Sequence, residues 1–165
     1  MASHLGATVF GTVGSSEKAE IARTAGCTHP ILYRDVAFED EVLRLTDGRG
    51  VDVVYDSIGA DTFTESLKAL AICGHLVNFG QSSGPVDPVA MGTLAEKSLT
   101  VTRPILFHYI HDTAQYRAMA QSVFDAFGAG TLKADLPSNF RLELAKEAHD
   151  LLDSRAATSG VVLRP

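Results

Sequence analysis

The sequence contains no tryptophan, only two cysteines and no run of lysines or arginines. Lys and Arg together number 14 against 20 Asp and Glu, so the formal net charge is -6. Proteins that bind the phosphate backbone need a basic field, so this balance argues against nucleic acid as a partner. Cys27 and Cys73 stand far apart and neither belongs to a Cys-x-x-Cys pair, which favours reduced thiols over a disulfide framework.

Long hydrophobic runs and metal motifs are also missing. No stretch approaches the roughly 20 consecutive apolar residues that span a bilayer, and residues 1–6 show no feature of a signal peptide. The six histidines lack metal-site spacing, and no Gly-x-Ser-x-Gly motif occurs. We therefore expect a cytoplasmic protein without membrane insertion, without a metal site and without serine-hydrolase chemistry.

The sequence does contain apolar, β-rich runs that alternate with segments of helical period. Its 165 residues, 45% of them apolar, suffice for one core of ordinary size. The alternation is typical of a parallel sheet covered by crossover helices, so we expect an α/β fold. Strands are predicted at residues 7–13, 30–33, 51–55, 75–79, 99–102 and 160–163. Helices are predicted at residues 17–25, 38–45, 63 up to Gly74, 91–97, 112–127 and 144–153.

The residues after the first strand favour one cofactor. In a doubly wound sheet ligands bind at the carboxyl ends of the strands, and an NAD-binding protein is expected to carry Asp or Glu after this strand. Here Gly14, Ser15 and Ser16 stand there, and Lys18 follows. Hydroxyl donors, a lysine and a helix N-terminus suit a 2′-phosphate, which favours NADP(H). The alternative is that Ser16 caps the next helix and Lys18 is a solvated side chain.

Three further strand ends carry candidate residues. Tyr33 and Arg34 could pack against an adenosine and its phosphate, or could form a half-exposed strand end. Residues 56–59 follow the third strand and residues 79–84 follow the fourth, and glycines in both segments let the backbone approach a ligand closely. Asp56 could instead make an Asx-turn or cap the following segment.

Taken in order, these segments resemble the NADPH-dependent quinone oxidoreductases of the zinc-free medium-chain dehydrogenase/reductase group, in their C-terminal part. The residues that carry the resemblance are Gly11-Thr12-Val13, Ser16-Glu17-Lys18, Tyr33, Val53 to Gly59, Phe79 to Pro85, Val101 to Pro104, and Ser154-Arg155-Ala156. The resemblance covers nearly the whole chain. The ordered set is specific, although no single segment is.

The resemblance implies roles for individual residues. It assigns the serine turn and Lys18 to the 2′-phosphate of NADPH, Tyr33 to the adenosine side, and Phe79 with the small-residue loop after it to the nicotinamide side. It also matches Arg155 to an arginine that reaches the cofactor phosphates. The predicted cofactor-binding residues are Gly14, Ser15, Ser16, Lys18, Tyr33, Ser57, Phe79, Gly80, Ser82 and Arg155. No catalytic residue is assigned, because quinone oxygens can take protons from water.

The sequence departs from this family's pattern at its start. Family members carry a strand and an Ala/Gly-rich turn upstream, and the turn presents backbone N–H groups to the pyrophosphate. We therefore expect a truncated Rossmann-like, doubly wound parallel sheet over residues 1–127 that lacks its first, Gly-rich-loop strand. Residues 128–165 are expected to form a linker, a helix and a strand that return to a catalytic domain outside this sequence.

The missing strand has a geometric consequence. In the strand order 3-2-1-4-5-6 the missing strand is central. Its loss leaves two unpaired edges, one on the first predicted strand and one on the third. We expect these edges to close on each other or to be filled by a second chain, rather than to leave a poorly ordered fragment. The strand from Leu99 to Thr102 resembles the edge through which family members dimerise, so we also expect a homodimer. The alternative is an exposed edge strand, which the modest length and the Thr100 and Thr102 pattern fit equally well.

Three functions are weighed. The first is hydride transfer from NADPH to a quinone or conjugated enone, in which the cofactor carries the chemistry and this chain alone is incomplete. The second is a non-catalytic remnant of a dinucleotide domain that acts as a binding or dimerisation module. The third is a class I methyltransferase, which the turn at Lys18 and the missing acidic, glycine-rich loop disfavour.

Overall fold

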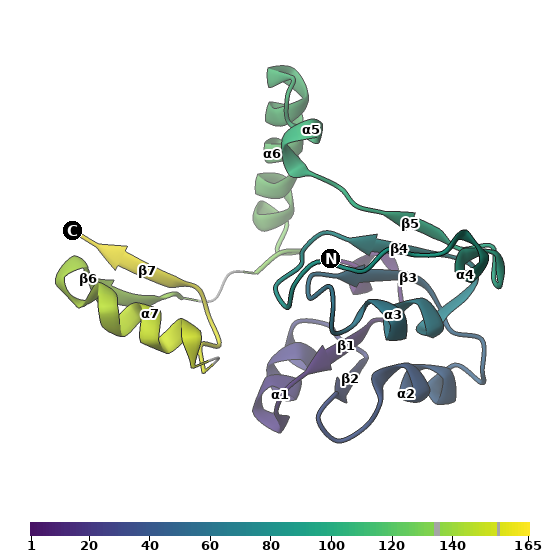
Figure 1. The fold of residues 1–165 in the computed structure, drawn as a ribbon. Coiled ribbons are helices and arrows are strands. Elements are labelled where there is room, and N and C mark those ends of the chain that lie inside the picture. Colours follow the sequence, from purple (N-terminus) through teal and green to yellow (C-terminus); the bar gives the residue numbers. More distant parts are fainter. Residues whose placement is uncertain (134–135, 155) are drawn as a thin grey trace. The chain divides into compact units, whose positions relative to one another are not determined.

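A computed structural model of the 165-residue chain describes residues 1–133, 136–154 and 156–165. The chain divides into two compact units, one of residues 2–122 and one of residues 123–165 together with Met1. The first unit contains the strands β1 (Phe10–Val13), β2 (His29–Leu32), β3 (Val51–Asp56), β4 (Leu70–Asn78) and β5 (Thr100–Thr102) (Figure 1). Its helices are η1 (Ser3–Leu5), α1 (Ser16–Thr24), α2 (Phe38–Leu45), α3 (Phe63–Ala69), α4 (Met91–Ala95) and α5 (Leu106–Tyr109).

The second unit is smaller. Helix α6 (Thr113–Gly128) crosses the division between the units, and the elements that follow are β6 (Ser138–Arg141), η2 (Leu142–Leu144), α7 (Ala145–Asp153) and β7 (Val161–Arg164). Strands β6 and β7 pair in parallel, and α7 packs on both. The boundary between residues 127 and 128 that the sequence predicts concerns function and not compactness, and it stays a prediction.

Every strand pair in the described residues is parallel, and helices connect the strands of the first unit. Strand β1 pairs with β2, and the order of the larger sheet is β3-β4-β5. Helix α1 packs on β1 and β2, while α3 packs on β3 and β4 (Figure 1). The α/β class predicted from the sequence is therefore confirmed.

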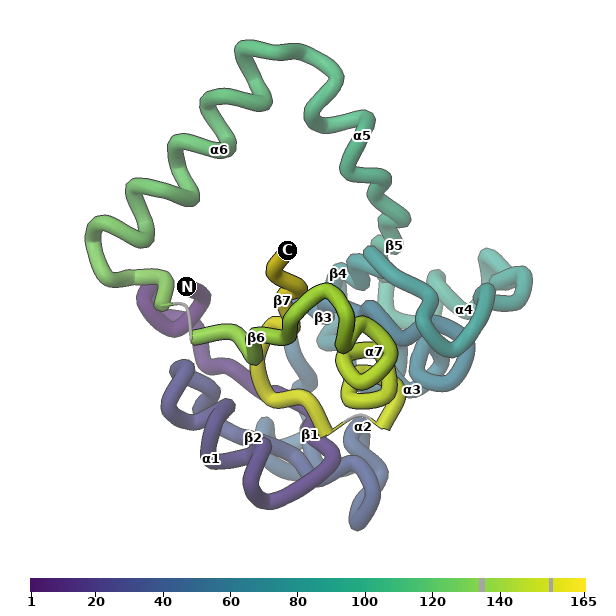
Figure 2. The backbone as a smooth tube through the Cα atoms, turned by 90° about the vertical axis from the view of Figure 1, so that its left-hand side faces the viewer, coloured from purple at the N-terminus to yellow at the C-terminus, as the bar shows by residue number. Residues whose placement is uncertain are grey.

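The two sheets of the first unit do not join through their backbones. Strands β1 and β3 are not hydrogen-bonded neighbours, so the expectation that these edges close on each other is wrong; β1 runs with β2, and β3 with β4 (Figure 2). Side chains join the sheets instead. Phe10 of β1, Val51 of β3 and Phe38 of α2 pack on a buried cluster of Ile31, Val42 and Ala69. This packing holds the two sheets together without strand pairing between them.

Strand β4 begins earlier than the sequence indicates. Helix α3 ends at Ala69, so the prediction that it continues up to Gly74 is wrong. Leu70 already pairs with Val51, but the register then shifts, and regular pairing resumes at His75, the predicted start of the strand. Residue Cys73 has a φ of 62°, and a Cβ on Gly74 would lie 2.9 Å from the carbonyl oxygen of Ala71. A tight bulge therefore separates the helix from the regular strand.

Other differences are small and have local causes. Strand β1 starts at Phe10 and not at residue 7. Helix α5 has four residues, too few to show a helical period, and β6 has the sequence Ser-Asn-Phe-Arg, which lacks an apolar run. Gly128 is the last residue of α6 and not its cap, and the positive φ of 71° comes two residues later at Gly130.

Both cysteines are free thiols, as expected. Burial raises the pKa of the Cys27 thiol, which lies against the backbone of β1: a Cβ on Gly11 would lie 2.9 Å from its sulfur. Cys73 is exposed at the bulge of β4. In the described part of the chain, we find no helix with the length and apolar character needed to cross a bilayer.

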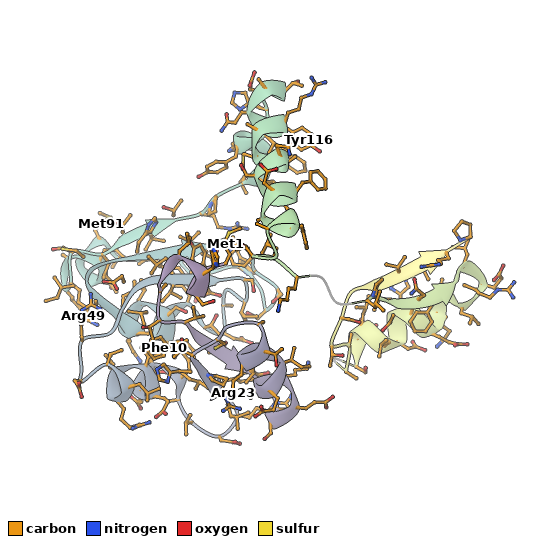
Figure 3. The ribbon with its side chains drawn as sticks, turned by 180° about the vertical axis from the view of Figure 1, so that it is seen from behind. Met1, Phe10, Arg23, Arg49, Met91 and Tyr116 are labelled. Carbon is orange, nitrogen blue, oxygen red and sulfur yellow. The ribbon has the colours of Figure 1, made fainter. Side chains whose placement is uncertain are left out.

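The main core lies between α3 and the β3-β4-β5 sheet. Its fully buried centre is Leu70 and Leu76, against which Phe63 and Leu67 of α3 pack. Large apolar side chains elsewhere stay exposed, among them Met91 on α4 (78%) and Tyr116 on α6 (51%) (Figure 3). The stability of the first unit therefore depends chiefly on the α3 face of the sheet.

Truncating Leu76 tests this view of the core. Leu76→Ala removes a side chain with no exposed surface, so we expect it to lower the free energy of unfolding by about 2–5 kcal/mol. Ile72→Ala on the same strand is the control, because Ile72 is 78% exposed, and its effect should stay within about 0.5 kcal/mol. Urea denaturation followed by circular dichroism measures both. Equal losses would contradict this core.

Candidate functional site

The turn after β1 is built around a helix cap. Ser15 has extended backbone angles (φ -157°, ψ 159°), and its Oγ accepts a hydrogen bond of 3.3 Å from the backbone N–H of Lys18. The N-cap of α1 is therefore Ser15, and the sequence interpretation that gave this role to Ser16 is wrong by one residue. Because Ser15 takes the cap, the hydroxyl of the exposed Ser16 is not used for it.

Tyr33 lies beside this turn because of the strand register. Val13 pairs with Leu32, and Gly14 and Tyr33 are the residues that directly follow this pair in the two strands. A Cβ on Gly14 would lie 3.0 Å from the Tyr33 Oη, and 45% of Tyr33 is exposed. The structure thus brings Tyr33 to the serine turn predicted from the sequence. No acidic residue stands directly after β1; Glu17 belongs to the first turn of α1 and is exposed.

The segments after β3 and β4 form one hydrogen-bonded unit, which we call the loop pair (residues 57–61 and 79–84). The backbone N–H of Ser82 donates to the carbonyl of Ser57 (3.2 Å), and that of Ser83 donates to the carbonyl of Ile58 (2.8 Å). A further bond of 3.2 Å runs from the N–H of Ala60 to the carbonyl of Gly84. Backbone hydrogen bonds therefore join the two segments at the carboxyl ends of two adjacent strands.

Glycine allows the two segments to approach this closely. A Cβ on Gly80 would lie 2.7 Å from the carbonyl oxygen of Ser57, and one on Gly59, whose φ is 92°, would lie 2.7 Å from the carbonyl oxygen of Gly84. Phe79 is 53% exposed at the start of the second segment. The predicted residues Ser57, Phe79, Gly80 and Ser82 all lie in the loop pair.

Buried polar residues at the ends of β3 and β4 hydrogen-bond to the loop pair. The buried polar or charged side chains among the described residues are Asp56, Ser66 and Asn78. Oδ1 of Asp56 accepts the backbone N–H of Ile58 at 2.8 Å, which is the Asx-turn that the sequence allowed. The Nδ2 of Asn78 donates to the carbonyl of Gly80 at 3.1 Å. Asn78 and Ser66 were missed from the sequence; the one signal for Asn78 was a polar amide near the end of an apolar strand.

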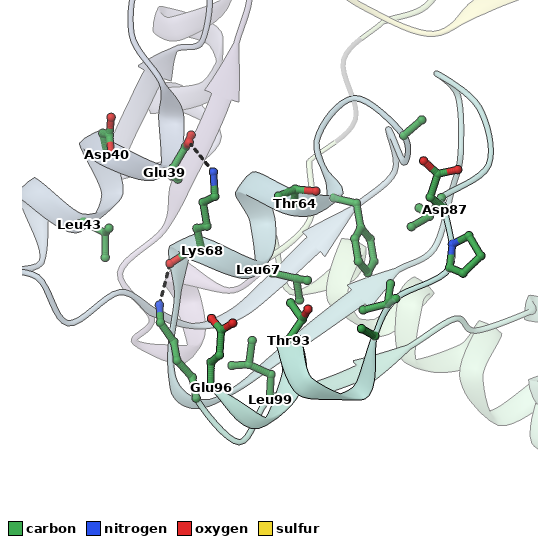
Figure 4. Close-up of a pocket in the computed structure, with 17 residues that line it drawn as sticks. Glu39, Asp40, Leu43, Thr64, Leu67, Lys68, Asp87, Thr93, Glu96 and Leu99 are labelled. Atoms are coloured by element: carbon green, nitrogen blue, oxygen red, sulfur yellow. Dashed lines mark hydrogen bonds and ion pairs between the residues drawn. The ribbon is translucent and has the colours of Figure 1, made fainter.

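A separate groove lies between helices and is not formed by strand ends. It has a volume of about 980 Å³ and is lined by α2, α3, α4 and residues 86–90 (Figure 4). Its lysines already have partners: Lys68 pairs with Glu39 at 4.0 Å, and the Nζ of Lys97 donates to the carbonyl oxygens of Lys68 and Leu70. None of the predicted site residues lines this groove.

Comparison with known proteins identifies the family. Residues 1–125 match the family described as zinc-binding dehydrogenase. The chain belongs to this family. It is 42% identical over 166 residues to the 2-haloacrylate reductase of Burkholderia sp, and the match covers 99% of this chain and 50% of that protein.

Solved structures agree with this assignment. The quinone oxidoreductase of Pseudomonas syringae pv. Tomato DC3000 is similar with a TM-score of 0.92 at 40% identity. That of Escherichia coli, in complex with NADPH, has a TM-score of 0.91 at 39% identity. Both matches cover 99% of this chain and 51% of the solved chain. The resemblance to quinone oxidoreductases is confirmed, and this member of the dehydrogenase family spans about half the length of these relatives.

Two predictions about the site of this dehydrogenase-family chain stay open. Arg155, predicted to reach the cofactor phosphates, lies outside the described residues. Within the described part of the chain, no group of three or more His, Cys, Asp or Glu side chains could hold a metal ion. The zinc-free assignment stays a prediction that rests on the resemblance.

A single methyl group tests the close approach in the loop pair. Gly80→Ala places a Cβ against backbone, which cannot rotate away, so we expect a loss of about 1–3 kcal/mol of stability. The control is Gly92→Ala in α4, where a Cβ would meet nothing within 4 Å, so stability should stay the same or rise by up to about 1 kcal/mol. Thermal unfolding measures both variants. A neutral Gly80→Ala would contradict the contact with Ser57.

Proposed function

We propose that this chain is the cofactor-binding part of an NADPH-dependent oxidoreductase that transfers hydride to a quinone or a conjugated enone. The observation that carries the proposal is the corner after β1 and β2, where Gly14, the Ser15-capped turn and Tyr33 meet without a carboxylate directly after the strand. The similarity to the NADPH complex of the Escherichia coli quinone oxidoreductase supports it.

The residues present fit the two ends of NADPH. At the first end, the exposed Ser16 hydroxyl, the N-terminus of α1 and Lys18 provide donors and positive charge for a 2′-phosphate, and the ring of Tyr33 lies beside them. At the second end, the exposed ring of Phe79 and the glycine-rich loop pair provide an apolar surface and close backbone for the nicotinamide.

The proposed reaction asks little acid or base chemistry of this chain. NADPH supplies the hydride when it is bound. The role proposed for the loop pair is to orient the nicotinamide and to shield one of its faces from water. A quinone oxygen takes its proton from water or a hydroxyl, so no strong general base is needed, and we assign no catalytic residue.

We further propose that residues 1–127 correspond to a Rossmann-like domain without its Gly-rich strand, and that residues 128–165 return to a catalytic domain outside this sequence. The two separate sheets, β1-β2 and β3-β4-β5, support the first part, because a 3-2-1-4-5-6 sheet with position 1 vacant would divide into these two groups of strands. The chain spans about half the length of each of these relatives, which supports the proposal that it is incomplete for catalysis.

A non-catalytic binding module is the second candidate. In the described chain, β1 and β3 each have an unpaired edge, and no strand with a Gly-rich turn lies between them. This observation favours the non-catalytic module. The two candidates differ in turnover: oxidation of NADPH by a quinone in the presence of this chain alone would exclude the non-catalytic module and the proposed incompleteness together.

Cofactor titration tests the proposed function. We expect weak binding with a preference for NADPH over NADH. The fluorescence of the nicotinamide measures the binding. Lys18→Glu should weaken NADPH by about tenfold, or about 1.4 kcal/mol, because it opposes the 2′-phosphate, and should leave NADH unchanged. Lys133→Glu, an equal charge change at an exposed residue, is the control. Micromolar binding of NADH over NADPH, or equal losses for both, would contradict the assignment.

We also propose that β5 forms a homodimer edge to edge. Its three residues pair only with β4 in the described chain, so one edge of the sheet is open. We expect a dimer in analytical ultracentrifugation. Thr100→Lys should shift the population toward monomer, because a lysine on an edge strand opposes pairing. Met91→Lys carries the same charge at a position that is 78% exposed and should not. A monomeric wild-type chain at high concentration would refute the dimer.

A further inference from the structure

The carboxyl end of β3 holds a buried carboxylate that the proposed cofactor chemistry does not use. Asp56 is the last residue of the strand and is 4% exposed. The ion pairs found among the described residues do not include Asp56. A buried charge without a counterion is costly unless hydrogen bonds satisfy it. The donors around Asp56 therefore indicate what this charge organises.

Four donor groups surround the carboxylate, two from the backbone directly after β3 and two from the N-cap and the first turn of α3. Oδ1 accepts the backbone N–H groups of Ile58 (2.8 Å) and Gly59 (3.2 Å). The hydroxyl of Thr62 lies 3.0 Å from both oxygens, and that of Ser66 lies 3.4 Å from Oδ2. Asp56 thus ties the first half of the loop pair to the first turns of α3.

The same segment then holds the second half of the loop pair. The carbonyls of Ser57 and Ile58 accept the N–H groups of Ser82 and Ser83, and the carbonyl of Asp56 itself accepts the N–H of Phe79 at 2.9 Å. The carbonyl of Ser57 also forms the surface against which Gly80 fits. A displacement of residues 57–59 therefore acts directly on Gly80, Ser82 and Ser83, the residues that follow Phe79.

Asn78 performs the matching task on the neighbouring strand. The register pairs it with Asp56, and it is 2% exposed. Its side chain holds the carbonyl of Gly80 directly. The Nη1 of Arg103 donates to the backbone carbonyl of Asn78 at 3.3 Å, which ties in the segment that follows β5. Asp56 differs from Asn78 in that it acts on the second half of the loop pair only through residues 57–59 and its own carbonyl.

We propose that Asp56 is a positioning residue for the nicotinamide side of the cofactor. It fixes the loop pair in the arrangement that presents Phe79, and it does not touch the cofactor itself. This inference rests on the proposed function. It separates two roles: Asp56 acts at the nicotinamide end, while the turn at Ser15 acts at the 2′-phosphate end.

Substitutions at Asp56 distinguish its hydrogen bonding from its charge. Asp56→Ala removes every acceptor and frees the N–H groups of Ile58 and Gly59. Asp56→Asn keeps Oδ1 for those two groups, and its new Nδ2 can donate to the Thr62 and Ser66 hydroxyls after these rotate. If positioning is the role, the asparagine should rescue what the alanine loses. Thr62→Val removes one donor without changing the side chain's volume much. It provides the test if the alanine variant fails to fold.

Ligand-observed saturation-transfer NMR on the whole chain with NADPH reads the two ends of the cofactor separately. The adenine and nicotinamide protons report on the serine turn and on the loop pair respectively. For Asp56→Ala we expect the nicotinamide signal to fall by at least about threefold relative to the adenine signal. We expect wild-type ratios for Asp56→Asn and a smaller fall for Thr62→Val. Circular dichroism confirms that each variant is folded.

Each contrary outcome identifies what has failed. If folded Asp56→Ala keeps the wild-type ratio of nicotinamide to adenine signal, the positioning role is overturned. This holds whether both signals are kept or both fall by the same factor, and it leaves NADPH binding in place. A wild-type chain with adenine signal and no nicotinamide signal would show that the loop pair does not receive the ring. No signal from either end in the wild-type chain would overturn the proposed function and this inference with it.

Discussion

The pairing of Asp56 with Asn78 across β3 and β4 is the constraint on which the loop pair, one half of the candidate site, depends. Parallel register brings two buried polar side chains to the same level at the ends of adjacent strands. Each side chain then bonds to the backbone of the segment that follows its own strand. The loops can pair closely because glycine stands at 59 and 80, where a Cβ would meet backbone. Apolar core residues could set the register, but they could not direct the loops.

Side-chain packing has a second, distinct role in this chain. The β1-β2 and β3-β4-β5 sheets share no backbone pairing, and the buried cluster of Ile31, Val42 and Ala69 joins them. Helix α3 contributes to both clusters, with Ala69 in the one that joins the sheets and Leu67 in the main core. Packing of this kind is non-directional, so it holds the sheets together without the regular ladder that a central strand would provide.

The sequence predicted the fold class and most elements because strands and helices here have clear periods. It predicted the bulge after α3 poorly, since the apolar residues Leu67, Leu70 and Ala71 continue a helical pattern while the backbone has already become a strand. The residue types that follow each strand were sufficient to select Gly14 with Tyr33, and the two segments of the loop pair, which the structure brings together.

What could not be predicted depends on three-dimensional register. The one-residue difference between Ser15 and Ser16 as helix cap depends on the backbone angles of the turn, and adjacent serines look alike in a sequence. Asn78 reads as one polar residue near the end of an apolar strand. Only its pairing with Asp56 and its bond to Gly80 show that it supports a loop.

The proposed weak binding of NADPH follows from where the two halves of the site stand. The corner at Ser15 belongs to the β1-β2 sheet, and the loop pair belongs to the β3-β4-β5 sheet. In a complete doubly wound sheet, the central strand ends in a turn whose N–H groups bind the pyrophosphate, which links the two ends of a dinucleotide. Two weak contacts joined by a ligand gain affinity only as far as the spacing between them is fixed. Here that spacing depends on side-chain packing alone, so the proposed site should hold the whole cofactor little more tightly than it holds either end.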